Sequence, residues 1–160
     1  MEAAVKSGPT SSPHPHHAGF TLLELLVVLA VLGVLLGVAY DTGLRWLQKT
    51  QVQHGVTQVE QDIALARSQA KRKNEAVAFE VTSLTGYSVG GVEHELPAGT
   101  AFTSAALNRK LTFQAPFGVL GGPASGDCTL PCEFPVQHRA NTEFSRTVRI
   151  VSLLGHGVIR

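Results

Sequence analysis

One carboxylate stands inside the most apolar stretch of the 160-residue chain. Glu24 lies near the start of residues 20–40, which are otherwise almost entirely apolar. At about 1.5 Å per residue, about 21 helical residues span about 30 Å, the thickness of a bilayer's hydrocarbon core. Because a charge there costs at least about 2.5 kcal/mol, an acid is a functional-site hypothesis and needs a partner. Cleavage after Gly19 would make Phe20 the N-terminus, and its α-amine would neutralise Glu24 within one subunit or between neighbours.

Two cysteines form a second group with possible chemistry. Cys128 and Cys132 are the only cysteines and lie four residues apart. In an exported domain an even pair indicates a disulfide, which would stabilise the fold by about 2 kcal/mol. Two alternatives stay open, namely free thiols and a zinc half-site that would need two further ligands. A redox pair is disfavoured, because its usual C-x-x-C spacing is absent.

The sequence contains no motif for a catalytic centre, a phosphate loop or a metal site. Glu93-His94-Glu95 places acids beside a histidine, but adjacent strand residues point to opposite faces and would not converge. We therefore interpret this tripeptide as a solvated loop. We predict a protein that is not an enzyme and that needs no cofactor or metal.

Basic residues gather in two places, although the whole chain is nearly neutral, with 13 basic and 12 acidic residues. One group ends the predicted helix, where cations favour the negative end of the helix dipole: Arg67, Lys71, Arg72 and Lys73. The other group lies in the C-terminal quarter: His138, Arg139, Arg146, Arg149, His156 and Arg160. Of these, Arg146, Arg149 and Arg160 are the candidate DNA contacts, in an interpretation that we do not favour.

The elements that must position these groups begin with a long helix. An apolar stripe steps by three and four residues: Val52, Val56, Val59, Ile63, Ala66 and Ala70. We predict one helix from about Phe20 to Lys73, interrupted or bent near residues 41–43 or at Gly55. Residues 20–40 would be its transmembrane half and residues 41–73 an amphipathic half. Gly33 and Gly37 form a G-x-x-x-G that permits close helix packing, or they are merely tolerated.

Strands follow the helix in residues 74–160. Alternating apolar residues at 77–81, 111–113 and 148–150 predict antiparallel strands, and turn signals such as Gly90-Gly91 separate them. Strands on one face of a helix give an α+β domain. Residues 86–110 contain no motif that we can place. Residues 1–19 are rich in proline, serine and histidine and are predicted to be a leader. Its histidines are not expected to bind metal, because processing would remove them.

The segment Gly19-Phe20-Thr21-Leu22-Leu23-Glu24 resembles the class III signal of type IV pilins and of type II secretion pseudopilins. A processing site, a buried acid and a membrane-length helix fall in register. An ordinary signal anchor is the alternative. Residues 63–70 with Asn74, then Leu111-Thr112-Phe113 and residues 149–160, are similar to GspH/FimT-like minor pseudopilins. The resemblance covers essentially all of the mature chain.

The resemblance implies a pilin-like fold, a long N-terminal transmembrane helix packed on a small antiparallel β-sheet domain. It implies cleavage by a prepilin peptidase between Gly19 and Phe20, N-methylation of Phe20, and an assembly role for Glu24. The implied partners are other pilins or pseudopilins in a filament, the prepilin peptidase, the inner-membrane assembly platform and membrane lipid. The implied location is the bacterial inner membrane, crossed once, with the C-terminal domain in the periplasm or outside.

Two roles follow from this resemblance. The favoured one is a non-catalytic structural subunit of a type II secretion pseudopilus or of a type IV pilus. The alternative is a DNA-binding minor pilin of DNA uptake. Some FimT-like members have a Gly-Arg-x-Arg tail, but here the corresponding residues are Gly155-His156-Gly157-Val158, so the tail does not match.

Overall fold

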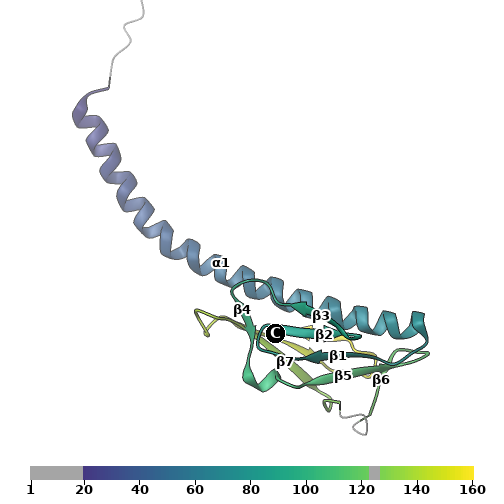
Figure 1. Cartoon of the computed structure of the whole chain (residues 1–160). Coiled ribbons are helices and arrows are strands. Elements are labelled where there is room, and N and C mark those ends of the chain that lie inside the picture. The colour runs from purple at the N-terminus through teal and green to yellow at the C-terminus, as the bar shows by residue number, and fades with distance from the viewer. Residues whose placement is uncertain (1–19, 123–126) are drawn as a thin grey trace, which may run out of the picture. The chain divides into compact units, whose positions relative to one another are not determined.

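The computed structural model describes residues 20–122 and 127–160, and the chain divides into two compact units between Tyr40 and Asp41. Helix α1 (Leu22–Lys73) begins in the first unit and continues into the second (Figure 1). The predicted leader, including Gly19, lies outside the described residues. The amphipathic part of the helix and the strands together make the second unit, residues Asp41–Arg160.

Helix α1 differs from the prediction at its start and in its continuity. It begins at Leu22 rather than Phe20, because Thr21 caps it. Of the predicted interruption or bend, an interruption was wrong, since the helix continues through residues 41–43 and through Gly55. Gly55 has a packing role instead: a Cβ there would lie 3.4 Å from Thr100 Oγ1 and from Val136 Cγ1. A Cβ at these distances would be in ordinary van der Waals contact, so the helix lies close to the strands of Thr100 and Val136 at this residue.

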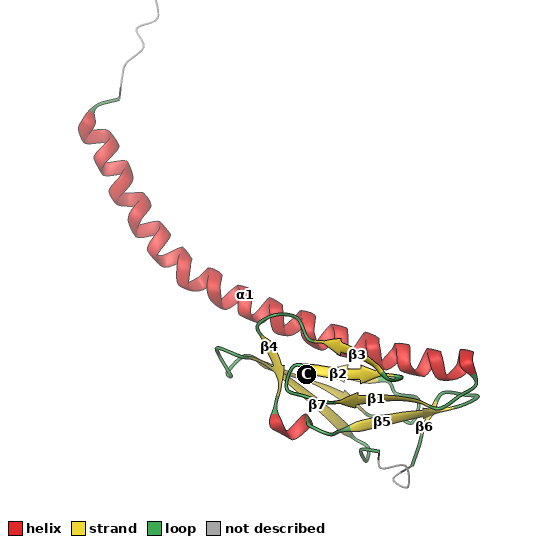
Figure 2. Ribbon diagram, viewed as in Figure 1, coloured by secondary structure: helices red, strands yellow, loops and turns green. Residues whose placement is uncertain are grey.

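The predicted apolar stripe of α1 is the helical side of the core. Its six members, from Val52 to Ala70, are at most 1 % exposed. Figure 2 shows this part of the helix lying along the strands of the second unit. Burial at every third or fourth position leaves the polar residues of the same helix on the outside, as the spacing predicts.

Two antiparallel sheets complete the unit, where the sequence predicted one small sheet. Sheet 1 has the order β3-β2-β1-β5-β6 and sheet 2 the order β4-β7-β8-β9. Sheet 1 contains β1 (Val77–Val81), β2 (Gly86–Val89), β3 (Val92–Glu95), β5 (Lys110–Gln114) and β6 (Val119–Leu120). Sheet 2 contains β4 (Thr100–Phe102), β7 (Cys132–His138), β8 (Ser145–Ile150) and β9 (Gly157–Ile159). A 3-10 turn (Ser104–Ala106) follows β4. The α+β prediction is confirmed.

Aromatic side chains join the two sheets in the core. The ring of Phe79 on β1 meets Phe134 on β7 edge to face, with 5.3 Å between centroids. Tyr87 on β2 meets Phe79 at 5.3 Å and Phe102 on β4 at 5.9 Å. Such pairs add to the stabilisation that comes from apolar burial alone.

The stretch for which the sequence showed no motif contains a tight hairpin. Val89 on β2 pairs with Val92 on β3, so Gly90 and Gly91 form a two-residue loop. Both glycines have positive φ, +59° and +84°, as the favoured hairpin turns require. Glu93-His94-Glu95 therefore belongs to strand β3, and its interpretation as a loop was wrong.

Strand β7 was not predicted because Pro135 interrupts its alternating pattern. Proline lacks the N–H that a central strand normally donates. Here the carbonyl of Pro135 accepts a hydrogen bond from the N–H of Thr103, one residue after β4 ends at Phe102. The backbone of Pro135 therefore faces the end of β4, where no strand residue needs its N–H. On the other edge of β7, the pairing with β8 continues on both sides of Pro135.

Candidate functional site

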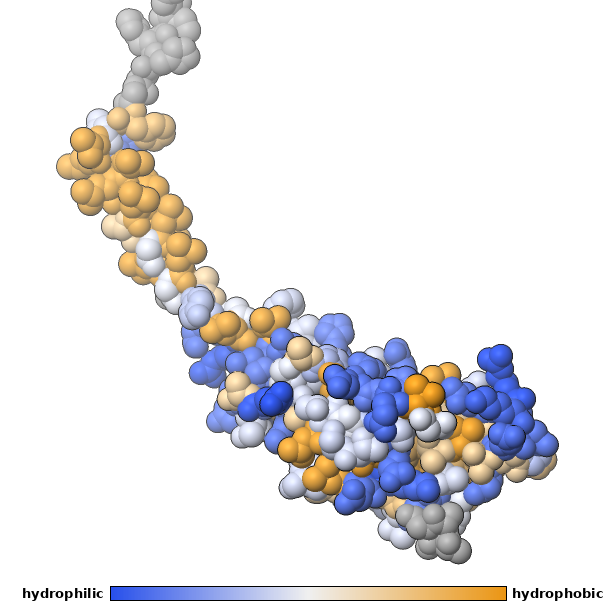
Figure 3. Space-filling view, viewed as in Figure 1, coloured by the Kyte–Doolittle hydropathy of each residue, from blue (hydrophilic) through white to orange (hydrophobic). Residues whose placement is uncertain are grey.

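The first unit presents an uncovered apolar surface. Every described side chain from Phe20 to Tyr40 is exposed, and Phe20 is 83 % exposed. Helix α1 contains a stretch that is long and apolar enough to cross a membrane, and none of this stretch is buried in this structure. Figure 3 shows apolar residues over this segment, whereas the second unit shows a largely polar face. Such a surface requires a nonaqueous environment or another protein.

Glu24 lies in the first turn of α1, within an N-terminal cap. Its backbone N–H donates to Thr21 Oγ1 at 3.2 Å, and the N–H of Leu25 donates to the Thr21 carbonyl at 3.2 Å. Thr21 and Glu24 are three apart, the spacing of a capping box. A carboxylate also interacts favourably with the positive end of the helix dipole. The capping spacing was visible in the sequence but was not used to set the start of the helix.

Gly33 and Gly37 lie on the exposed segment. A Cβ added to either would meet no described atom within 4 Å. Their small size therefore serves no contact within the part of the chain that the structure describes. Close packing at these glycines would need a second molecule, so the G-x-x-x-G prediction stays a prediction.

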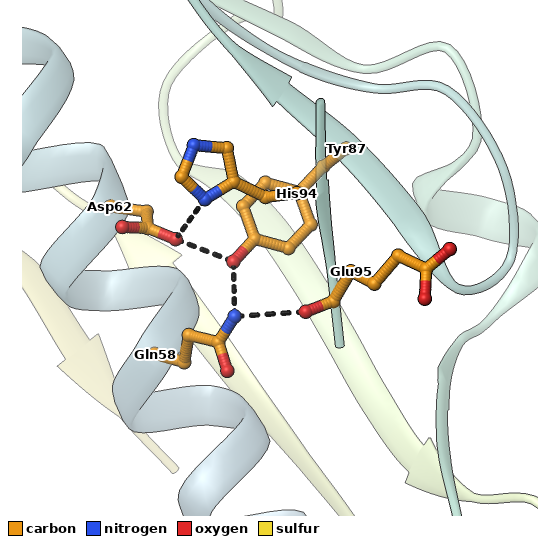
Figure 4. Close-up of polar contacts among 5 residues, drawn as sticks. All are labelled: Gln58, Asp62, Tyr87, His94 and Glu95. Atoms are coloured by element: carbon orange, nitrogen blue, oxygen red, sulfur yellow. Dashed lines mark hydrogen bonds and ion pairs between the residues drawn. The ribbon is translucent and has the colours of Figure 1, made fainter. Parts of the chain in front are cut away.

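A polar cluster joins the helix to the β2–β3 hairpin (Figure 4). The hydroxyl of Tyr87 donates to Asp62 Oδ2 at 2.5 Å, and His94 Nδ1 lies 3.5 Å from the same oxygen. Gln58 Nε2 donates to the Tyr87 hydroxyl at 2.8 Å and to the Glu95 carbonyl at 2.9 Å. The His94 ring stacks on Tyr87, with 5.6 Å between centroids. Two helical residues thus hold both strands of the hairpin.

This polar cluster has the properties of a structural contact between helix α1 and the β2–β3 hairpin. Burial, and then the hydrogen bond to Asp62, raise the pKa of Tyr87 above its usual value, so the phenol stays protonated and donates. His94 reaches Asp62 from the neighbouring strand, which sequence reasoning missed because Asp62 is distant in the chain. Across residues 20–122 and 127–160 no group of three His, Cys, Asp or Glu residues is arranged to hold a metal ion.

The two cysteines are joined in a disulfide, as the sequence predicted, with 5.7 Å between their Cα atoms. Cys132 begins β7 and is buried. The N–H of Cys128 donates to the Lys110 carbonyl at 2.9 Å. Beside it, Asp127 accepts from Thr112 Oγ1 at 2.7 Å and from Thr112 N–H at 3.0 Å. The disulfide therefore closes a loop that is also bound to β5.

The candidate DNA contacts do not form one surface. Arg146 shares the face of β8 that carries buried Val148 and Ile150, whereas Arg149 points to the other face. Arg149 Nε lies 3.4 Å from Glu133 Oε1 on β7. Arg160 lies opposite Thr147 and so shares the face of Arg149. His138, from the same basic group, is only 7 % exposed and bonds Gln51 at 3.0 Å.

Comparison with known proteins gives matches in both sequence and fold. Residues 15–40 match a family model described as the prokaryotic N-terminal methylation motif. Two curated proteins of Pseudomonas aeruginosa, each named fimbrial protein, are 32 % identical over 82 residues, 51 % of this chain and 53 % of the relative. The chain thus spans about half the length of the curated relatives it matches.

Two crystal structures of the type IV minor pilin FimU of Pseudomonas aeruginosa are also similar. One has a TM-score of 0.50 at 18 % identity and covers 72 % of this chain and 90 % of its own. The other has a TM-score of 0.48 at 19 % identity and covers 68 % and 91 %. At such low identity the likeness is one of fold. The methylation motif thus spans Phe20 and Glu24, and the fold of the chain is similar to that of a type IV pilin.

Proposed function

We propose that the chain is a membrane-anchored minor pilin or pseudopilin, a non-catalytic structural subunit of a filament. The observation that carries the proposal is the exposed apolar helix, with Glu24 in its first turn and the methylation motif over the same residues. Apolar side chains on all sides of a helix suit a bilayer, and they equally suit the packed helices of a filament. The activity that we propose is the transfer of this helix between the bilayer and the filament.

Glu24 is the residue that would direct assembly. We propose cleavage between Gly19 and Phe20, followed by N-methylation of Phe20. In the described residues no cation lies within ion-pair distance of Glu24. A partner for its carboxylate would then be the N-terminal amine of a neighbouring subunit. In a low-dielectric environment such a pair forms only when the two groups are in register, because an unpaired buried charge is strongly unfavourable.

The same proposal includes location and partners. The protein would cross the inner membrane once, with residues 41–160 on the periplasmic side, and would contact a prepilin peptidase, an assembly platform and other pilins. The curated relatives are named fimbrial proteins and the structural relative is a type IV minor pilin. These names favour a pilus over the type II secretion pseudopilus as the host filament.

The DNA-binding alternative is not favoured by any observation of the described surface. Its three candidate arginines are divided between two sheet faces, and Arg149 is paired with Glu133. Phosphate recognition requires cations that follow a nucleic-acid backbone together.

The test is the intact mass and N-terminal sequence of the protein purified from its own membrane. A chain that begins at Phe20 and is heavier there by one methyl group supports pilin-type processing. A chain that still begins at Met1 would contradict the proposal, and a chain cleaved elsewhere without methylation would indicate an ordinary signal.

A further inference from the structure

An aromatic and basic hollow lies in the second unit, close in sequence to the end of the apolar segment. Its volume is about 480 Å³, and its lining includes Trp46 and Lys49 from α1 together with Phe144 and Arg146 from the region where β8 begins. Glu143 also lines it. The hollow plays no part in the processing or pairing reactions proposed above, which concern residues 19–24.

Trp46 is the reason to expect an unusual environment here. It is the only tryptophan in the chain and is 67 % exposed. It begins the helical turn that Thr50 closes, since Thr50 Oγ1 donates to the Trp46 carbonyl at 2.9 Å. A largely exposed tryptophan is unfavourable in water but is the preferred residue at a membrane–water interface, where its ring is apolar and its N–H is hydrated.

Two cations lie beside the ring. Lys49 Nζ is 5.5 Å from the centroid of Phe144, a cation–π contact that holds the amine at the hollow. Arg146 lines the same hollow and is exposed. Against these two cations stands the single carboxylate of Glu143. Arg45, the next cation along the helix, is already paired with Asp41 at 3.3 Å. The hollow thus has a net positive charge and suits an anionic group.

The hollow begins only a few residues after the apolar segment ends. Trp46 follows Ala39, the last aliphatic residue of the apolar segment, by seven residues. Seven residues span about 10 Å in a helix and at most about 25 Å when fully extended. The headgroup layer and interface extend several ångströms beyond the hydrocarbon core on each side. A helical Trp46 would therefore lie a few ångströms beyond that layer, and because helical side chains tilt toward the N-terminus, its ring reaches the headgroups when residues 20–40 span a bilayer.

We propose that this hollow binds the headgroup of an anionic phospholipid, with the phosphate beside Lys49 and Arg146 and the Trp46 ring against the headgroup. The inference rests on the proposed function, since it needs residues 20–40 in a bilayer. Its consequence is that the stored subunit holds its globular unit against the membrane surface. Extraction into a filament then requires release of this lipid as well as transfer of the apolar helix.

The single tryptophan allows a direct test with the full chain reconstituted in phosphatidylcholine vesicles. Trace phosphatidylglycerol or phosphatidylcholine, each with a nitroxide near the top of an acyl chain, is added, and quenching of Trp46 fluorescence gives relative association. Phosphatidylglycerol has a net negative charge and phosphatidylcholine has none, so at about 1 kcal/mol for the one net positive charge of the hollow we expect about fivefold stronger association of labelled phosphatidylglycerol. Lys49→Gln with Arg146→Gln should bring the preference close to one. The matched control, Arg72→Gln with Lys73→Gln, removes the same charge from the far end of α1 and should retain it.

Each other outcome has a definite meaning. Equal quenching by the two labelled lipids, or loss of the preference in the control pair as well, would overturn the lipid site. Quenching of Trp46 only by aqueous iodide would do so too. A shift of Trp46 emission that grows with protein concentration in lipid-free detergent would indicate a second copy of the chain as occupant. Vesicle flotation separates the two proposals: a protein that fails to float contradicts the membrane-anchored function itself, whereas one that floats without the preference contradicts only the lipid site.

Discussion

The hydroxyl of Tyr87 on β2 donates a 2.5 Å hydrogen bond to Asp62 of α1, and through this contact the helix holds the β2–β3 hairpin. Strand β3 is an edge strand of sheet 1, so this contact lies near the edge of the sheet. Gln58 and His94 complete the cluster from the helix and from β3. Loss of the hydroxyl would leave Asp62 and Gln58 without one of their partners.

Stability should fall at high pH because of this tyrosine. The pKa of Tyr87 is raised in the folded protein, whereas an unfolded tyrosine loses its proton near pH 10. The stabilisation is therefore complete below about pH 10 and is lost as pH rises toward the folded pKa, since the unfolded state then binds fewer protons. We expect Tyr87→Phe to remove this component of the pH dependence and to cost about 1–3 kcal/mol at neutral pH.

Denaturant unfolding between pH 8 and about 11, followed by circular dichroism, measures both quantities. The control is Tyr40→Phe, because Tyr40 is 71 % exposed and belongs to the other unit. Parallel pH profiles for the wild type and Tyr87→Phe would refute the assignment of the buried phenol.

Glu24→Gln should prevent assembly without preventing insertion. The amide keeps the size of the side chain but leaves the neighbour's amine without a counter-charge in an apolar environment. We expect the filament fraction to fall by about tenfold or more, since an unpaired charge costs at least about 2.5 kcal/mol there. The measurement is the amount of this chain in sheared filaments relative to membranes.

Thr21→Ala is the matched variant for that experiment. It removes the Oγ1 that accepts from the Glu24 N–H and keeps the carboxylate. Loss of the cap costs about 1 kcal/mol of local helix stability. If Thr21→Ala abolishes assembly as completely as Glu24→Gln, the cap rather than the charge explains the effect.

Gly155→Ala should destabilise the second unit strongly. Gly155 has φ of +70°, and a Cβ there would lie 2.6 Å from Cε1 of the buried Phe113 ring. Left-handed backbone costs about 1–2 kcal/mol for an L-residue, and overpacking adds about 1–3 kcal/mol. Gly91→Ala separates the two terms, because Gly91 has φ of +84° but open space around it. Thermal unfolding of both variants should show the larger loss at Gly155, and equal losses would contradict the close contact with Phe113.

Reduction of the Cys128–Cys132 disulfide should lower the free energy of unfolding by about 2 kcal/mol. Denaturant titration with and without a reducing agent measures it, and the double substitution to serine should make the protein insensitive to the agent. A wild type that is equally insensitive, with free thiols found by alkylation, would show that the pair is reduced in solution. The Asp127–Thr112 bonds should keep the loop near β5 in the reduced protein.

The sequence predicted best where one residue pattern determines the outcome. The helix stripe from Val52 to Ala70 and the alternation in β1 both reflect burial on one face, and both were found in the structure. Strand β7 was missed because Pro135 is acceptable only where β4 has already ended. The β2–β3 hairpin was missed because its strands are short and β3 is mostly exposed, although its Gly90-Gly91 turn was recognised.

The candidate sites divide in the same way. The spacing of Gly19, Phe20 and Glu24 is a local pattern that can be read from the sequence, and the methylation motif covers these residues, whose roles stay predictions. The polar cluster of Asp62, Tyr87 and His94 depends on the pairing of β2 with β3 and on the turn of α1 that these strands contact. Among the basic residues, Arg146 and Arg149 occupy opposite faces because they are three residues apart in one strand, whereas the face of Arg160 depends on its pairing with Thr147.

The continuity of α1 has a mechanical consequence. Since no loop separates its exposed apolar part from its buried stripe, tension on the N-terminal end passes through backbone hydrogen bonds arranged in series. Within the second unit, the buried side chains from Val52 to Ala70 resist tension along the helix axis together. Gly55, seated against Thr100 and Val136, lies within this loaded segment. One helix thus belongs to both units, and its residues from Val52 to Ala70 fix it in the core of the second.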